Sequence, residues 1–213
     1  MNELDKLSYA FEDALLSVNP SAAKNILVKA RQQHDFSDLA EYVISDAFER
    51  IGKAWDDGEL ALSQVYVSGQ IAEKVVNEIS QPSDIHQNYQ NKIAIALLDD
   101  YHMLGKRMVH MILQASGFLV MDFGRVDVDE LVKRVKDEKI NILLISTLML
   151  RSALQIKDAC RQLKEAGLDV KVIVGGAPFR FDHELWREVG ADAMGLNAAQ
   201  AIHLITDMMD EMP

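Results

Sequence analysis

Residues 93–105, which read IAIALLDDYHMLG, decide how the rest of the chain is interpreted. The first six are an uninterrupted apolar run, whose length and composition are typical of a strand buried on both faces. Two aspartates follow at once, and an amphipathic stretch then begins near Gly105. The segment therefore predicts a strand, a polar loop and a helix, which is the opening unit of a parallel α/β sheet.

The same alternation continues along the C-terminal part of the chain. Strands are expected at Ile93–Leu98, Phe118–Phe123, Ile142–Thr147, Val170–Val174 and Ala191–Met194. Helices are expected near 105–116, 127–138, 150–166, 182–189 and 198–211. The pattern predicts a doubly wound, five-stranded parallel sheet of the Rossmann-like or flavodoxin-like kind. Because ligands of such sheets bind beyond the carboxyl ends of the strands, the loops after strands one, three and four are expected to hold the site.

The N-terminal part of the chain shows a helical rhythm instead. Asn19-Pro20-Ser21 ends a first helix and begins a second, because proline suits the first helical turn. Ser37 is a candidate cap for a third helix, which Asp56-Asp57-Gly58 ends. A fourth helix extends from Leu62 to Ile79, and four helices with short connections predict a small antiparallel bundle.

A polar, aperiodic stretch separates the two parts and is typical of a linker. The predicted organisation is a helical cap at 1–82, a linker at 83–91 and an α/β domain at 92–213.

Composition excludes several classes of protein. The net charge of −11 provides no basic footprint for nucleic acid. No apolar run has the roughly 20 residues that a membrane span needs, and the first 20 residues lack the pattern of a signal peptide. Since the single Cys160 cannot form an internal disulfide framework, we expect a cytoplasmic protein.

The loop after the first strand contains the spacing Asp-x-His-x-x-Gly, formed by Asp100, His102 and Gly105. A neutral imidazole is a good ligand for a borderline transition metal, and such an imidazole needs an acceptor on its other nitrogen. Asp100 is well placed to be that acceptor. Taken alone, however, His102 is also compatible with an ordinary surface histidine, and Asp100 with a helix N-cap.

Two further motifs follow at the ends of later strands. Ser146-Thr147-Leu148 comes after the third strand, with Ser152 one turn beyond, and Gly175-Gly176 comes after the fourth. Together with Asp-x-His-x-x-Gly, these motifs resemble cobalamin-dependent methionine synthase and the corrinoid methyl-carrier proteins. The resemblance extends to the N-terminal part, because a four-helix cap precedes the cobalamin-binding domain in those families.

The resemblance implies roles for individual residues. His102 would ligate cobalt from below with the cofactor's own base displaced, and Asp100 and Ser152 would complete a chain that couples coordination to proton uptake. The displaced nucleotide tail would lie in a crevice within the domain. The residues expected to bind the cofactor besides these three are Met103, Leu104, Gly105, Ser146, Leu148, Gly175 and Gly176. Within this set, Ser146 would hydrogen-bond the base of the tail and Leu148 would line its slot, while the glycines admit the tail or form an ordinary turn.

Three aromatic residues of the helical part, Phe48, Trp55 and Tyr66, have two interpretations. Their spacing favours core positions within a bundle. Alternatively, some of them cover the upper face of a bound corrin, since residues 51–59 resemble the cap of corrinoid proteins.

The function implied is that of a cobalamin-binding carrier rather than a complete enzyme. It would transport a methyl group on cobalt between a substrate-specific methyltransferase and an acceptor methyltransferase, with a reductive activase as a further possible partner. The main alternative is a regulatory cobalamin sensor that acts by binding a partner. A subunit of a radical mutase and a flavodoxin-like module without cobalamin are less favoured.

Overall fold

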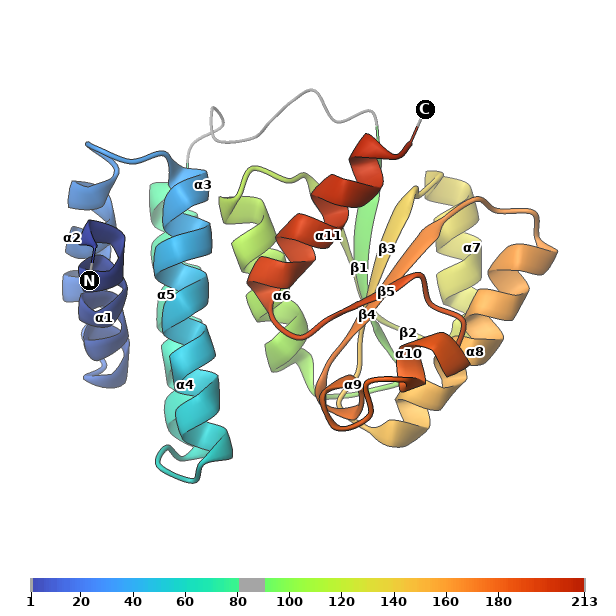
Figure 1. Cartoon of the computed structure of the whole chain (residues 1–213), viewed down its shortest axis with the longest axis horizontal. Coiled ribbons are helices and arrows are strands. Elements are labelled where there is room, and N and C mark those ends of the chain that lie inside the picture. Colours follow the sequence, from blue (N-terminus) through green and yellow to red (C-terminus); the bar gives the residue numbers. More distant parts are fainter. Residues whose placement is uncertain (1, 81–90, 213) are drawn as a thin grey trace. The chain divides into compact units, whose positions relative to one another are not determined.

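The computed structural model describes residues 2–80 and 91–212. These residues form two compact units (Figure 1): a helical unit of residues 2–80 with Met111–Phe118, and an α/β unit of residues 91–110 with 119–212. Of the predicted linker 83–91, only Asn91 lies among the described residues. The boundaries 1–82, 83–91 and 92–213 therefore stay predictions.

The helical unit begins with two capped helices. The helix α1 (Glu3–Leu16) starts at Asn2, whose side chain and that of Asp5 cap each other's backbone amides at 2.8 Å. The helix α2 (Pro20–Ala30) starts at Asn19, whose side chain accepts from the Ala22 amide. The break predicted at Asn19-Pro20-Ser21 is confirmed.

The third helical run differs from the prediction. It comprises α3 (Phe36–Leu39), a π-helical turn η1 (Ala40–Ser45) and α4 (Asp46–Asp56), and its N-cap is Asp35 rather than Ser37. The buried Ser8 hydroxyl donates to the Val43 carbonyl at 2.9 Å, and this bond from α1 satisfies a carbonyl within the widened turn.

The last helix of this unit, α5, covers Leu62–Ile79 and follows a turn at Gly58 (φ 77°). Phe48 is buried, as expected for a core residue. Trp55 and Tyr66 are 39% and 49% exposed, so the prediction that they belong to the core is wrong.

The α/β unit confirms the predicted five-stranded, all-parallel sheet, with strand order β2-β1-β3-β4-β5. Its strands are β1 (Ile93–Leu98), β2 (Val120–Val126), β3 (Ile142–Ser146), β4 (Lys171–Gly175) and β5 (Ala193–Gly195). Its helices are α7 (Val128–Glu138), α8 (Leu150–Glu165), α9 (Ala177–Phe181), α10 (Leu185–Glu188) and α11 (Ala198–Asp210). The helix α6 (Met103–Ala115) begins in this unit, and its residues from Met111 onward belong to the helical unit. The helix expected near 182–189 is present as the short α10 (Leu185–Glu188), and the structure adds the short helix α9 directly before this region.

Helices cover both faces of the sheet, with α7 and α8 on one face and α11 and the start of α6 on the other (Figure 1). The core against α7 and α8 is built by alternate residues of β1, Ala94, Ala96 and Leu98, together with Leu131 and Ile156 of the helices. No helix among the described residues is long and apolar enough to cross a membrane.

Candidate functional site

The carboxyl end of β1 leads directly into the motif loop. All six residues of β1 are buried, and Asp99 then turns the chain with a left-handed backbone (φ 43°). This turn is unusual for a residue other than glycine. It delivers Asp100 to a buried position while His102, just before α6, stays at the surface.

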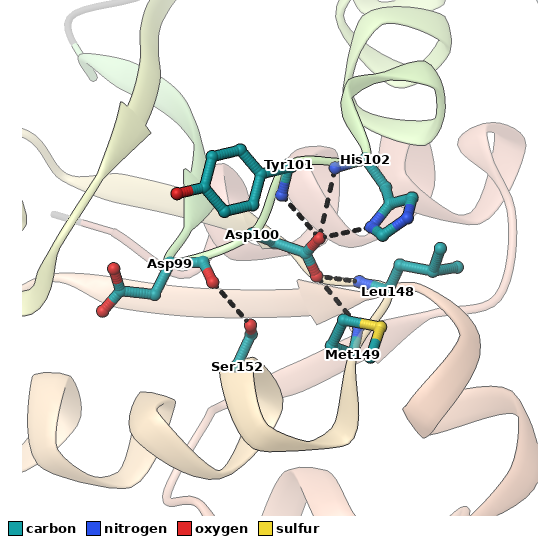
Figure 2. A network of polar contacts seen from close by, with 7 residues as sticks. All are labelled: Asp99, Asp100, Tyr101, His102, Leu148, Met149 and Ser152. Carbon is teal, nitrogen blue, oxygen red and sulfur yellow. Dashed lines mark hydrogen bonds and ion pairs between the residues drawn. The ribbon is translucent and has the colours of Figure 1, made fainter.

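The Asp100 carboxylate is the hub of the loop (Figure 2). One oxygen, Oδ1, accepts from the Tyr101 amide at 2.7 Å, the His102 amide at 3.1 Å and, at 2.7 Å, His102 Nδ1. The other, Oδ2, accepts from the amides of Leu148 at 2.7 Å and Met149 at 2.9 Å, which follow β3. Since the carboxylate is 0% exposed, its bonds are all made within the protein, and they tie two predicted motifs together.

The same contacts keep Asp100 ionised. Burial acts to raise the pKa of this carboxyl, but the bonds that it accepts, first from the Met149 amide and the His102 ring, outweigh burial. The pKa of Asp100 therefore lies well below its usual range. A permanent anion beside Nδ1 favours the imidazole tautomer that carries its proton on that nitrogen.

His102 is oriented but not enclosed. Its side chain is 53% exposed, and Nδ1 is engaged with Asp100. No residue of the part that the structure describes shares a hydrogen bond with Nε2, which points away from Asp100 in Figure 2. The loop thus presents one imidazole nitrogen with its lone pair directed outward.

Ser152 does not occupy the place that the resemblance implies. Its buried hydroxyl donates to the Asp99 carbonyl at 2.8 Å, not to the Asp100 carboxylate (Figure 2). Both oxygens of that carboxylate accept from other groups. The direct His–Asp–Ser chain is therefore absent from this structure, and Ser152 supports the loop through the backbone instead.

Gly105 and Ser146 lie close together although they come from different elements. A Cβ atom built on Gly105 would meet only the Ser146 hydroxyl oxygen, at 3.8 Å, which is ordinary van der Waals contact. The described protein atoms therefore do not require glycine at this position. A small residue beside a hydroxyl fits the passage of an external polar chain.

The glycines after β4 serve the chain itself. At Gly176 (φ 118°) an added Cβ would lie 1.8 Å from the Thr147 carbonyl oxygen, and at Gly175 it would lie 3.1 Å from the Gly195 carbonyl oxygen. The backbone at position 176 lies so close to the Thr147 backbone that this contact is sufficient to require glycine there. The alternative that this pair forms a turn required by the fold is thereby supported for Gly176.

The remaining predicted contact residues surround the loop. Met103 and Leu148 are exposed and Leu104 is half-buried. Large apolar side chains left open beside His102 are suited to an apolar ligand surface.

Sequence reasoning missed an ion pair next to this loop. Lys106, which follows Gly105, is buried, and its ammonium group donates to the Asp122 carboxylate of β2. Burial acts to raise the pKa of Asp122, but the bonds from Lys106 and from the Gly124 amide, with the nearby positive charge of Lys106, together outweigh burial and lower this pKa. The pair fixes the start of α6 against β2, and a lysine inside the first turn of a predicted helix was the only signal in the sequence.

Comparisons with known proteins identify the family of this chain. A family described as "B12 binding domain" matches residues 91–203, and a second family with the same description matches residues 8–79. The chain belongs to the B12-binding corrinoid proteins. The predicted family of methyl-carrying corrinoid proteins is thereby confirmed, and so is the predicted corrinoid cofactor.

Relatives of this corrinoid protein occur in methanogens. It is 28% identical to dimethylamine corrinoid protein 3 of Methanosarcina acetivorans, over 95% of this chain and 96% of that one. It is 31% identical to the trimethylamine corrinoid protein of Methanosarcina barkeri, over 78% of each chain. The structure of the monomethylamine corrinoid protein of Methanosarcina barkeri aligns with a TM-score of 0.73 and 26% identity, over 97% of this chain and 99% of that one.

Proposed function

We propose that this corrinoid protein holds its cofactor through His102 and carries a methyl group for the methyltransferases of a methylated amine. The observation that carries the proposal is the Asp100–His102 pair, in which a buried anion binds Nδ1 and leaves Nε2 directed outward. An imidazole arranged in this way is the usual form of a metal-ligating histidine.

Asp100 acts as the group that orients the ligand. Four backbone amides and the ring nitrogen of His102 hold its carboxylate in one position, so the imidazole has little freedom to turn. Because the acceptor is already in place, coordination at Nε2 loses little conformational entropy. His102 would then hold the cofactor in place of the cofactor's own base.

The chain also offers a place for a displaced nucleotide tail. The space that a side chain would fill at Gly105 is free of described protein atoms except the hydroxyl oxygen of the half-buried Ser146. We assign the Ser146 hydroxyl to a hydrogen bond with the base of the tail and Leu148 to the slot that surrounds it, and the open side chain of Met103 to an apolar surface of the cofactor. Gly176 contributes by letting the chain after β4 lie close to Thr147, and Gly175 by letting the end of β4 lie close to Gly195.

When bound, the corrinoid supplies a cobalt centre that accepts a methyl group and gives it up again. The chain supplies the ligand at Nε2, the orientation of that ligand and the surroundings of the cofactor. Residues 1–82 are proposed to be the cap of the cofactor, joined by residues 83–91 to the binding domain at 92–213.

The partners follow from the relatives, whose names refer to monomethylamine, dimethylamine and trimethylamine. We assign the donor side to a methyltransferase specific for one of these amines. We assign the acceptor side to a second methyltransferase and propose a reductive activase as a further partner.

The test uses the full chain loaded with hydroxocobalamin and reduced. It is mixed in turn with purified mono-, di- and trimethylamine methyltransferases and their ¹⁴C-methyl substrates, with a methanol methyltransferase as the control. The expected result is label on the loaded protein with one of the amine enzymes, and none with His102→Gly. Labelling by methanol alone contradicts the amine assignment. Cobalamin binding without labelling by any enzyme contradicts the carrier function and favours the regulatory sensor.

A further inference from the structure

Tyr101, which lies between the two motif residues Asp100 and His102, is exposed but firmly held. Its side chain is 77% exposed, while its backbone amide donates to Asp100 Oδ1. The guanidinium of Arg125 lies over its ring, 4.1 Å from the ring centre. A single exposed aromatic residue needs no explanation in general. This one differs because a cation fixes one face of its ring and leaves the rest open.

Arg125 is placed by an irregularity in β2. The register between β1 and β2 shifts there, so that Ile95 pairs with Asp122 whereas Leu97 pairs with Arg125. Gly124 adopts a left-handed conformation (φ 66°), and its amide donates to Asp122 at 2.6 Å. A bulge of this type redirects the side chain that follows it, which here brings Arg125 to the Tyr101 ring.

Asp99 links the two residues. One of its carboxylate oxygens lies 3.8 Å from an Arg125 nitrogen, and its amide donates to the Val126 carbonyl at 2.9 Å. The Ser152 hydroxyl holds its carbonyl from α8. Contacts from β2 and α8 thus stabilise a left-handed aspartate, which would otherwise cost about 1–2 kcal/mol.

We propose that Tyr101 and Arg125 form a second contact for the bound corrinoid and recognise the carboxamide side chains at the rim of the ring. The inference rests on the proposed ligation by His102. Consecutive Cα atoms lie about 3.8 Å apart. A corrin ring with its amide side chains is much wider than this spacing, so the rim of a ring held at His102 Nε2 would come within reach of the neighbouring residue.

The chemistry of the two residues matches that rim. A corrin ring carries acetamide and propionamide groups, which have both carbonyl acceptors and N–H donors. The Tyr101 hydroxyl can donate and accept, and the Arg125 guanidinium has five donors, of which its contact with Asp99 leaves most available. Since both side chains are already ordered, binding loses little rotamer entropy.

The experiment measures the dissociation constant of the full chain for hydroxocobalamin by visible absorption, together with the nitrogen splitting in the electron paramagnetic resonance spectrum of the cobalt(II) form. Tyr101→Ala should raise Kd about tenfold, Arg125→Ala about fivefold and Tyr101→Phe about threefold. The axial nitrogen splitting should persist in all three. The control is Arg187→Ala, which removes a second stack, over Trp186 at 4.5 Å, and should change Kd by less than about twofold.

Thermal unfolding of each cofactor-free variant checks that the fold persists, and Tyr101→Phe retains the ring if Tyr101→Ala unfolds. The inference is overturned if Tyr101→Phe and Arg125→Ala both bind as tightly as Arg187→Ala. Failure of the proposed ligation by His102 would give a different result from failure of this inference. The wild-type protein and all variants at residue 101 would then lack the splitting from a histidine nitrogen.

Discussion

The segments that follow β1 and β4 both begin at the carboxyl edge of the sheet, yet Gly105, in the first turn of α6, and Gly176, after β4, serve opposite needs. At Gly105 an added Cβ would touch only one hydroxyl oxygen, at 3.8 Å. At Gly176 it would lie 1.8 Å from a carbonyl oxygen of the chain's own backbone. The described protein atoms leave Gly105 open, as the proposed ligand site requires, whereas the fold itself requires glycine at 176. A glycine motif alone does not distinguish these two roles.

The largest effect is expected at Gly176. Gly176→Ala must move the Thr147 carbonyl and place alanine at a φ of 118°. We expect the free energy of unfolding to fall by about 4 kcal/mol, as measured by urea denaturation of the cofactor-free protein. A loss below about 1 kcal/mol would mean that the backbone contact is easily relieved and that the two segments do not differ as described.

The next effect concerns the hub of the β1 loop. Asp100→Ala leaves the amides of Leu148 and Met149, whose bonds to the carboxylate are partly buried, without their acceptor. We therefore expect the free energy of unfolding to fall by about 3 kcal/mol in the same assay. The matched control is Asp127→Ala, which removes an exposed N-cap bond of α7 and should cost about 1 kcal/mol. Equal losses for the two variants would contradict the central position of Asp100.

Acid should act through the same carboxylate. The pKa of Asp100 is lowered in the folded protein, so this group stabilises the fold above the pKa of an unfolded aspartate, about 3.9, and the contribution is lost as the pH falls. Urea denaturation of the cofactor-free protein at several pH values between 7 and 3 measures this dependence. Below pH about 4, the free energy of unfolding should fall less steeply with decreasing pH in Asp100→Asn than in the wild type. Parallel declines would show that Asp100 contributes nothing to the acid sensitivity.

The smallest effect on stability is expected at Gly105. Gly105→Ala should raise the free energy of unfolding by about 0.5–1 kcal/mol, because alanine favours the first turn of α6 and meets no obstacle. The same change should weaken hydroxocobalamin binding about tenfold, because the methyl group enters the proposed path of the tail. Gln114→Ala, exposed on the same helix, should leave binding unchanged. If Gly105→Ala binds hydroxocobalamin with unaltered affinity, the proposal that the nucleotide tail passes Gly105 is contradicted.

Much of the fold was accessible from the sequence because its signals are local. The apolar run of β1 begins and ends at the predicted residues, Ile93 and Leu98. The π-helical turn at residues 40–45 was not accessible, because the Val43 carbonyl depends on Ser8, 35 residues away in the chain. Periodicity also failed for Trp55, since a helical stripe does not show where the bundle ends and its exposed surface begins.

The candidate site divides in the same way. The pairing of His102 with Asp100 was predicted, since the two residues lie two positions apart on one loop. The sequence could not show that the backbone amides of Leu148 and Met149 bind Asp100, because every residue except proline has a backbone N–H group. The change of partner for Ser152 depends on the left-handed turn at Asp99, which no residue type announces.

The central claim is the bond from His102 Nε2 to cobalt, and isotope labelling tests it most directly. The full chain is prepared with ¹⁵N-histidine, loaded with cobalamin, reduced to the cobalt(II) form and examined by electron paramagnetic resonance. The account predicts that each axial triplet of the unlabelled protein becomes a doublet, and that His102→Gly abolishes this change. A triplet that persists in the labelled wild-type protein would assign the axial nitrogen to the cofactor's own base and contradict the account.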